Sequence, residues 1–157
     1  MTFSMISPVR RLLLEQSAIV FYHPRPSWPT HVLLVPRCAI GSYRDIAPTN
    51  VHMVSSLFSL APRVAYMLQL GPREYSLLLN GEARQDVGQL HVHLVAPPLE
   101  VPAGATLCPF AASGLARGTE LLSACAWLRS RRSVQDRKGF SLLAQHGLEG
   151  SVYLVHD

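Results

Sequence analysis

A strict alternation of polar and apolar side chains in residues 89–95, QLHVHLV, constrains this chain more than any other feature. Successive side chains on a β-strand point to opposite faces, so we expect a strand over residues 87–95. Gln89, His91 and His93 would then share one face, while the apolar residues between them enter the core. Polar groups in such a place need hydrogen-bond partners or solvent. The pattern therefore predicts a strand that presents two imidazoles and an amide.

Three interpretations of this polar face remain open from the residues alone. The face can simply be solvated. Alternatively, His91 and His93 can supply two ligands to a divalent ion, with His31 as a third, although no carboxylate stands at an obvious spacing. In the third interpretation, one imidazole is a nucleophile toward phosphorus, and its neighbour donates to a phosphate oxygen or to the leaving group.

The hydrophobic periodicity of the surrounding sequence predicts an α+β fold. Apolar residues at helical spacing begin after Pro48 and continue to Leu68, and Pro62 predicts a kink or a division into two shorter helices. Runs of β-forming residues bounded by Pro, Gly and Asn predict further strands over 18–23, 30–36 and 75–80. We therefore expect an antiparallel sheet of about five strands with packed helices.

The sequence after residue 98 predicts a loop over 99–118, a helix over 119–132 and two short strands over 140–145 and 151–156. This part loosely repeats an earlier pattern, because YSLLLNGE and FSLLAQHG each follow a helix and precede a strand. No linker in the sequence requires two domains. We expect a core over residues 1–98 and a C-terminal helix-hairpin extension over 99–157, packed on the same domain.

Composition narrows the class of protein. Hydrophobic residues make up 48% and charged residues 15%, which excludes a disordered chain. Because no apolar run approaches the ~18 residues of a membrane-spanning helix, we expect a soluble, cytoplasmic protein with no membrane partner. The three cysteines lack the spacing of a zinc site or a disulfide framework. The net charge is +4, but no aromatic residues are interleaved with the basic run over 129–138, so we do not expect nucleic acid as a partner.

The polar strand and two further motifs resemble the histidine triad (HIT) family. That family carries histidines alternating with hydrophobic residues on a strand, and residues 89–95 stand in this place with Gln89 at the first histidine position. Residues 29–37, PTHVLLVPR, match the end of the family's first hairpin. Residues 75–80 match a strand that ends in Asn before the triad strand. The likeness runs from about residue 12 to residue 98 and implies a HIT-like fold.

The resemblance implies catalytic roles for three side chains. His91 occupies the position of the family nucleophile, which attacks an α-phosphorus and becomes nucleotidylated, and the backbone carbonyl of residue 89 would orient its ring. His93 occupies the third triad position and would contact the phosphoryl group. Gln89 can donate and accept hydrogen bonds but cannot titrate, so it cannot give a proton to a leaving group.

The same resemblance implies four substrate-binding residues. His31 matches an additional family histidine beneath the site, and Asn80 and Gln85 match polar residues that hold the phosphate and the leaving-group side. His23 stands where the family often has an Asp that receives the ribose hydroxyls. A histidine can make one such bond rather than two, which predicts a different nucleoside affinity or sugar preference.

As a whole, the resemblance implies a nucleotide hydrolase or nucleotidyl transferase that acts through a covalent nucleotidyl-histidine. Its partner would be a nucleotide or a nucleotide conjugate, such as a nucleoside phosphoramidate or a dinucleoside polyphosphate. No metal or cofactor is needed for this chemistry, and family members commonly form homodimers. The alternative is a non-catalytic module in which the HIT scaffold binds a nucleotide or serves in assembly. Gln89 and His23 favour this alternative, and the retained polar set argues against it.

Overall fold

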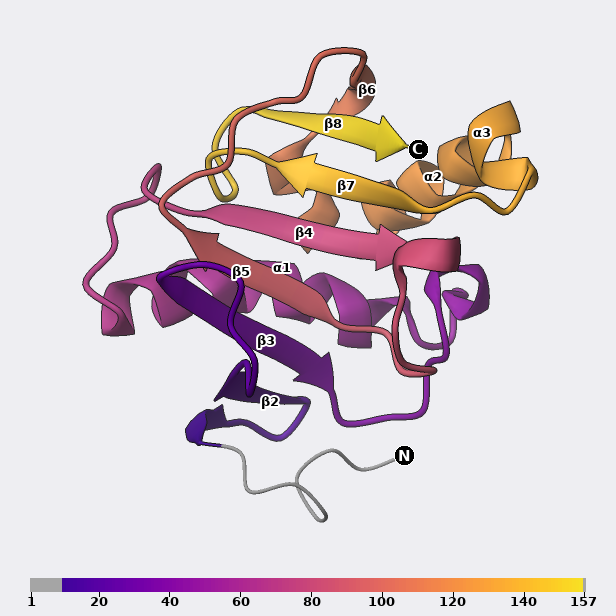
Figure 1. The fold of residues 1–157 in the computed structure, drawn as a ribbon. Coiled ribbons are helices and arrows are strands. Elements are labelled where there is room, and N and C mark those ends of the chain that lie inside the picture. Colours follow the sequence, from indigo (N-terminus) through magenta and orange to yellow (C-terminus); the bar gives the residue numbers. More distant parts are fainter. Residues whose placement is uncertain (1–9, 157) are drawn as a thin grey trace.

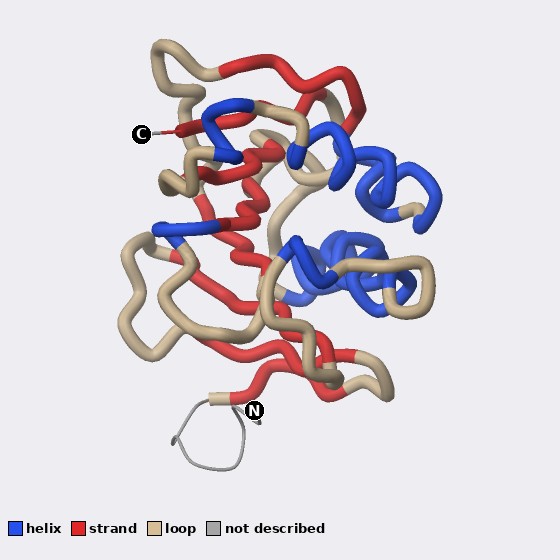
Figure 2. Tube along the Cα trace, turned by 90° about the vertical axis from the view of Figure 1, so that its right-hand side faces the viewer, coloured by secondary structure: helices blue, strands red, loops and turns tan. Residues whose placement is uncertain are grey.

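The computed structural model describes residues 10–156, which form one antiparallel sheet with helices packed on one face (Figure 1 and Figure 2). The order of the eight strands is β1-β2-β3-β5-β4-β7-β8-β6. The strands are β1 (Arg11–Leu14), β2 (Ala18–Tyr22), β3 (Thr30–Pro36), β4 (Ser76–Gly81), β5 (Val92–Ala96), β6 (Thr106–Ala111), β7 (Phe140–Ala144) and β8 (Ser151–His156). The helices are α1 (Val51–Met67), α2 (Gly118–Arg129) and α3 (Arg132–Gln135), with 3-10 turns η2 (Tyr43–Asp45), η3 (Glu82–Arg84) and η4 (Ala112–Ala116).

Helix α1 packs on the sheet because one of its faces is apolar. Val54, Leu57, Ala61 and Val64 recur at intervals of three or four residues and are fully buried. Pro62 lies on the exposed side, and the helix continues through it as one element. The predicted division into two shorter helices is therefore wrong, because a proline on the solvent side removes one hydrogen bond but leaves the buried face intact. Among the described residues, no helix combines the length and the apolar character needed to cross a membrane.

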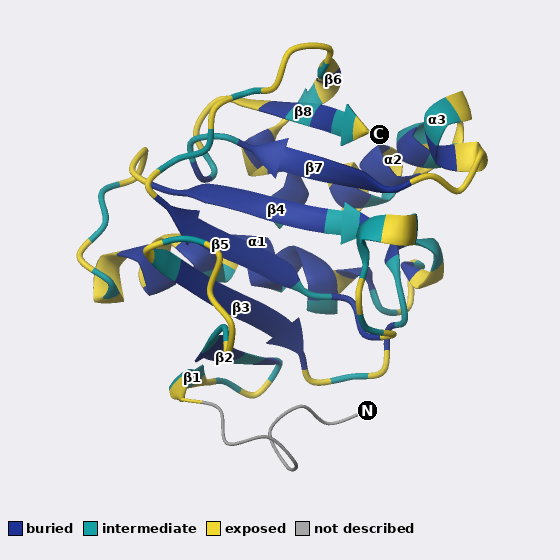
Figure 3. Ribbon diagram, in the orientation of Figure 1, coloured by how far each residue is buried: buried dark blue, intermediate teal, exposed yellow. Residues whose placement is uncertain are grey.

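The central strands are buried on both faces, as the dark blue ribbon in Figure 3 shows. Val32 and Leu34 of β3 join the main core with α1. The alternate residues Leu33 and Val35 form a second, smaller cluster with Phe21 of β2. His31 and His93, the buried histidines of these strands, therefore need hydrogen-bond partners within the protein.

The sheet has eight strands rather than the predicted number of about five. Strand β1 precedes the first predicted strand, and β6 lies within the region predicted to be a loop, 99–118. Pro109 weakens the strand signal of β6, and it is tolerated because β6 is an edge strand. The predicted helix over 119–132 is also shorter than expected: α2 ends at Arg129, and α3 follows as a separate turn.

The strand predicted over 87–95 starts late, since β5 begins at Val92. The backbone N–H of Leu90 donates to the carbonyl oxygen of Ile40 at 2.7 Å and so does not join a strand ladder. Residues 87–91 therefore approach the sheet as an irregular segment. Side chains alternate between the two faces of the sheet only within β5, which includes His93. This alternation does not determine the direction of the Gln89 side chain, because residue 89 lies before the strand.

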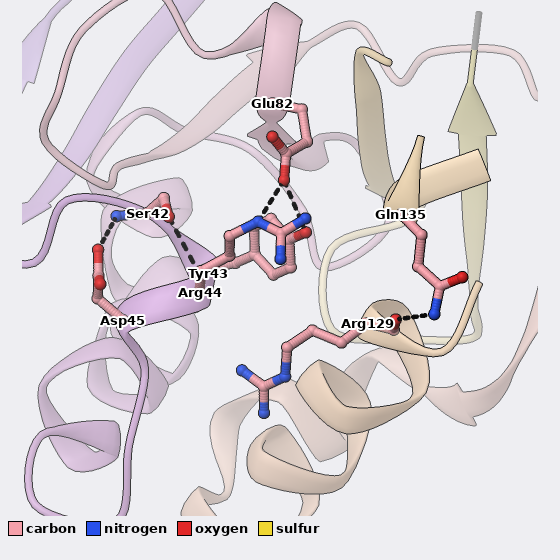
Figure 4. Close-up of polar contacts among 7 residues, drawn as sticks. All are labelled: Ser42, Tyr43, Arg44, Asp45, Glu82, Arg129 and Gln135. Carbon is pink, nitrogen blue, oxygen red and sulfur yellow. Dashed lines mark hydrogen bonds and ion pairs between the residues drawn. The ribbon is translucent and has the colours of Figure 1, made fainter. Parts of the chain in front are cut away.

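The segment that leads from β4 to these residues is anchored at Glu82. This residue has a φ of 53°, a left-handed conformation that is uncommon outside glycine. Figure 4 shows its carboxylate facing the side chains of Tyr43 and Arg44: the Tyr43 hydroxyl donates to it at 2.9 Å, and Arg44 Nε donates at 2.5 Å. The two bonds from η2 hold Glu82 in this conformation and fix the start of the segment that carries His91.

Candidate active site

Four histidines meet on the face of the sheet opposite α1. His31 lies on β3 and His93 on β5, while His91 immediately precedes β5 and His23 follows β2. The ring of His23 stacks on that of His31 with centroids 4.2 Å apart, and the His31 and His93 centroids are 5.1 Å apart. The sequence-predicted residues His23, His31, His91 and His93 are thus brought together in one cluster.

A chain of hydrogen bonds fixes the protons of His31 and His93. The backbone N–H of Ser27 donates to Nδ1 of His31 at 3.1 Å, so neutral His31 carries its proton on Nε2. That Nε2 lies 2.9 Å from Nδ1 of His93 and therefore donates to it. Neutral His93 must then carry its own proton on Nε2, which makes this atom a donor.

A second chain of hydrogen bonds fixes the amide of Asn80. Arg84 Nη1 donates to the Ser141 hydroxyl at 3.0 Å, and that hydroxyl donates to Oδ1 of Asn80 at 2.6 Å. The amide is thereby oriented with Nδ2 at 3.5 Å from Nε2 of His93. Both nitrogens carry hydrogen, so neither accepts from the other. The two donor nitrogens are close enough for one acceptor, such as a phosphoryl oxygen, to accept from both.

His91 has the opposite tautomer to His93, with a lone pair rather than a proton on Nε2. Its Nδ1 lies 2.8 Å from the carbonyl oxygen of Gln89, the contact expected from the sequence. Because a carbonyl only accepts, Nδ1 carries the proton and Nε2 carries the lone pair. The half-buried ring packs edge-on against His93, with centroids 4.8 Å apart. The ring that carries this lone pair therefore packs against the ring that carries the Nε2–H donor.

Burial keeps the four imidazoles neutral near pH 7. Desolvation, assisted by the neighbouring histidines, lowers the pKa of His93 to about 3 and the pKa of His31 to about 4. Desolvation also lowers the pKa of His91 and of His23, and the Asp86 carboxylate opposes this shift in both. Neutral rings preserve the tautomers derived above and keep the lone pair of His91 available.

The two glutamines of the predicted site bond to backbone carbonyls rather than to imidazoles. Gln85 Nε2 donates to the carbonyl oxygen of Gly41, and Gln89 Nε2 donates to that of Cys38 at 3.2 Å. Gln89 is 2% exposed. The predicted face shared by Gln89 with the two histidines is not formed by strand geometry, because residues 87–91 are not a strand. Gln89 reaches His91 through its backbone carbonyl.

Two hollows flank the cluster. One of about 330 Å³ lies at the turn after β2 and is lined by Arg10, Tyr22, His23, Pro24, Pro26, Pro29 and His31. The other, a cleft of about 470 Å³ next to Asn80, is lined by residues from both predicted parts of the chain: Trp28, Leu78, Asn80, Arg84, Asp86, Leu99, Glu100, Pro102, Ser141, Leu143 and Val155. Sequence reasoning missed Arg84 and Ser141, and the repeat of YSLLLNGE in FSLLAQHG is the signal that could have found Ser141.

A metal centre finds little support in these contacts. Within residues 10–156, no group of three or more His, Cys, Asp and Glu side chains is arranged to hold a metal ion. Hydrogen bonds engage both ring nitrogens of His31, the candidate third ligand, and Nδ1 of His91. These nitrogens would have to give up their partners to bind a metal.

The antiparallel sheet and the histidines on β3 and β5 can be compared with known protein families. The sequence pattern of the HIT domain matches residues 7–98. The chain therefore belongs to the HIT domain family.

Several curated relatives share this region. A HIT-like protein of Buchnera aphidicola is 26% identical over 92 residues, covering 57% of this chain and 82% of the relative. A HIT-like protein of Azospirillum brasilense is 32% identical over 95 residues, covering 57% and 75%. The purine nucleoside phosphoramidase of Escherichia coli K12 is 25% identical over 72 residues, covering 45% and 60%. Relatives of this chain thus include a nucleotide-processing enzyme.

Two solved structures are also similar to this chain. A HIT family hydrolase from Clostridium thermocellum has a TM-score of 0.54 and 27% identity, covering 62% of this chain and 84% of its own. The yeast Ap4A phosphorylase in complex with AMP has a TM-score of 0.54 and 17% identity, covering 92% of this chain and 57% of its own. The second likeness concerns the fold alone, and it reaches past residue 98 into the C-terminal part.

Proposed function

We propose that this protein is a nucleotide hydrolase or nucleotidyl transferase in which Nε2 of His91 forms a covalent bond with the α-phosphorus of the substrate. One observation carries the proposal: the His91 ring, with its lone pair on Nε2, packs against His93, whose Nε2–H donor lies 3.5 Å from the Nδ2–H donor of Asn80. Transfer at phosphorus needs a nucleophile together with donors for the charged oxygens. A relative named as a purine nucleoside phosphoramidase supports the substrate class.

The reaction has two steps. In the first, Nε2 of His91 attacks phosphorus, a P–N bond forms, and the bond to the leaving group breaks with its electron pair going to that group. The positive charge that develops on the ring is stabilised by the Gln89 carbonyl through Nδ1–H. His93 and Asn80 donate to a phosphoryl oxygen. Because the Gln89 side chain cannot titrate, the leaving group takes its proton from water.

In the second step, water attacks phosphorus and releases a proton to solvent, and the P–N bond breaks with its electron pair returning to Nε2, which restores the starting tautomer of His91. In a transferase, another acceptor takes the place of this water. Clustered neutral imidazoles suit both steps, because a protonated neighbour would disfavour the positive charge that forms on His91 during attack.

The two hollows accommodate the two halves of such a substrate. We assign the nucleoside to the hollow lined by His23, and the leaving group to the cleft next to Asn80. The backbone N–H of Arg25 donates to Nδ1 of His23 at 2.9 Å, which leaves Nε2–H to bind one ribose hydroxyl. Gln85 contributes by holding the segment before His91 through its bond to Gly41.

The test is hydrolysis of adenosine 5′-phosphoramidate by the purified chain, by His91→Ala and by the control His52→Ala. His52 is an exposed residue of α1 outside the cluster. We expect turnover by the wild type and by His52→Ala, with kcat/KM lowered at least about 10³-fold in His91→Ala. Turnover that survives in His91→Ala would contradict the proposal.

One observation favours a second candidate, a non-catalytic nucleotide-binding or assembly module. The residue at the first triad position, Gln89, is a buried amide that cannot supply a proton. This candidate predicts that AMP binds in calorimetry while no phosphoramidate or polyphosphate is turned over. Turnover by the wild type excludes it.

A further inference from the structure

The two parts of the chain have the same order of elements. Residues 30–96 run β3, η2, α1, β4, β5, with η3 inserted between β4 and β5, and residues 106–156 run β6, η4, α2, β7, β8, with α3 inserted between α2 and β7. In each part the first strand pairs with the last, and the last pairs with the one before it. Helices α1 and α2 pack on the same face and contact each other (Figure 2). The second part thus repeats the first over more elements than the sequence alone indicates.

The pairing of β4 with β7, called the seam below, has the form of a two-fold interface. Aligning YSLLLN with FSLLAQ makes Leu78 the counterpart of Leu143, and these two residues pair directly in the sheet. In a symmetric interface, a residue on the axis faces its own counterpart, and its neighbours exchange partners. Leu77 pairs with Ala144, the counterpart of Leu79, as this symmetry requires.

Two serines repeat the symmetry at the level of hydrogen bonds. The Ser76 hydroxyl donates to the carbonyl oxygen of Gln145 at 2.6 Å, and the Ser141 hydroxyl donates to Oδ1 of Asn80, also at 2.6 Å. Ser76 is the counterpart of Ser141, and Asn80 is the counterpart of Gln145. Each hydroxyl also accepts one bond, from a backbone N–H in one case and from a guanidinium in the other.

Aromatic rings also cross the seam in both directions, although the glycines that they meet are offset by one residue in the repeat, since the counterpart of Gly81 is His146. A Cβ on Gly81 would lie 2.2 Å from the Phe140 ring, and a Cβ on Gly147 would lie 2.6 Å from the Tyr75 ring. Tyr75 and Phe140 are counterparts in the repeat. Each part therefore packs one ring against a glycine of the other.

The second part has kept these contacts without the histidines. His93 pairs with Leu78, and the corresponding partner of Leu143 is Tyr153. The connection between β4 and β5, residues 82–91, carries His91, whereas the connection between β7 and β8 is only residues 145–150. The second part does contain His146, in this connection, and His156, at the end of β8. His146 bonds to the carbonyl oxygen of Arg73, and neither ring belongs to the histidine cluster.

We propose that the part from β6 to β8 is an internal partner: a copy of the first part that kept the two-fold contacts, lost the histidines and acts on the remaining cluster through Ser141. The hydroxyl of Ser141 holds Oδ1 of Asn80 away from His93, so that the amide presents Nδ2 as the second donor. Without this bond the amide can turn, and Oδ1 would accept from His93 and remove both donors from the substrate. Ser141 is thus a positioning residue, and its effect on catalysis rests on the proposed function.

The two-fold relation supplies a matched pair of variants, Ser141→Ala and Ser76→Ala. Each removes one donated and one accepted hydrogen bond at the seam, but only Ser141 contacts Asn80. We expect similar losses of Tm in both. Ser141→Ala is expected to lower kcat/KM for adenosine 5′-phosphoramidate about 10- to 100-fold, whereas Ser76→Ala stays within about twofold. Ser141→Thr, which keeps the hydroxyl, is expected to restore activity.

A second readout does not depend on activity. The side-chain NMR resonances of His93 are expected to shift in Ser141→Ala and to stay unchanged in Ser76→Ala, with His93→Gln used for assignment. Such a shift in a chain that turns over no nucleotide would support the internal partner and refute the proposed enzyme. Unchanged His93 resonances in Ser141→Ala, or equal effects of the two serine variants on kcat/KM, would overturn the internal partner.

Discussion

The chemistry of this protein depends on which nitrogen of each imidazole holds the proton. Ser27 sets the tautomer of His31, which sets that of His93, while the Gln89 carbonyl sets that of His91 in the opposite sense. Neighbouring neutral histidines thus become a donor and a nucleophile. A sequence motif shows that the histidines are present, but the hydrogen-bond partners decide what each one does.

The buried histidines make stability depend on pH. The folded pKa values of His93, about 3, and of His31, about 4, lie below the unfolded value of 6.5. Above pH 6.5 both rings are neutral in either state. Between that pH and about 4 the unfolded chain binds protons that the folded chain excludes. We therefore expect the free energy of unfolding to fall, as pH is lowered, by about 1.4 kcal/mol per pH unit for each ring.

Urea unfolding at a series of pH values measures this slope. His93→Gln is expected to reduce it by about 1.4 kcal/mol per pH unit, because one excluded proton is removed. His52→Gln, at an exposed position, is the control and should leave the slope unchanged. A slope that stays the same in His93→Gln would show that this ring is protonated equally in both states.

At the scale of elements, the sequence pattern predicts strands well where turn residues bound an apolar run. The predictions for 18–23, 30–36, 75–80 and 140–145 correspond to β2, β3, β4 and β7. Strand β1 was not predicted, because a strand of four residues is too short to show an alternation of polar and apolar side chains. The start of β5 was misplaced because Leu90 bonds to Ile40, a partner distant in sequence that no local pattern reveals.

The candidate site also contains residues that the sequence predicts and residues that it does not. The motif and the resemblance bring together His31, His91 and His93, because His31 and His93 lie on the adjacent strands β3 and β5 and His91 immediately precedes β5. The connection from Asn80 to Ser141 depends on the pairing of β4 with β7, which a single sequence does not specify. Local periodicity describes each strand, whereas the partner of a strand is a long-range choice.

The seam itself can be tested at Gly81. Gly81→Ala is expected to lower the free energy of unfolding by about 1–3 kcal/mol, because the new Cβ would lie 2.2 Å from the fully buried ring of Phe140. Denaturant unfolding measures the change. Gly88→Ala is the control, since nothing lies within 4 Å of a Cβ there. Equal stability of the two variants would mean that Phe140 moves aside at no cost.

At the scale of the whole molecule, one sheet runs through both parts of the chain. Because β7 covers the edge of β4, a second copy of the chain cannot extend the sheet there. The outer strands are short or contain Pro109, which also disfavours edge-to-edge pairing. The homodimer implied by the family resemblance stays a prediction, and it would have to use a surface other than the seam.

The measurement that tests the central claim most directly is the mass of the whole chain during turnover. The protein is mixed with adenosine 5′-phosphoramidate and the reaction is quenched within milliseconds. Mass spectrometry of the intact chain then measures any added mass, and peptide mapping locates it. We predict a transient adduct of one nucleotidyl group per chain, located on His91 and absent from His91→Ala. Turnover with no adduct at any quench time, or an adduct on another residue such as His93, would contradict covalent catalysis by His91.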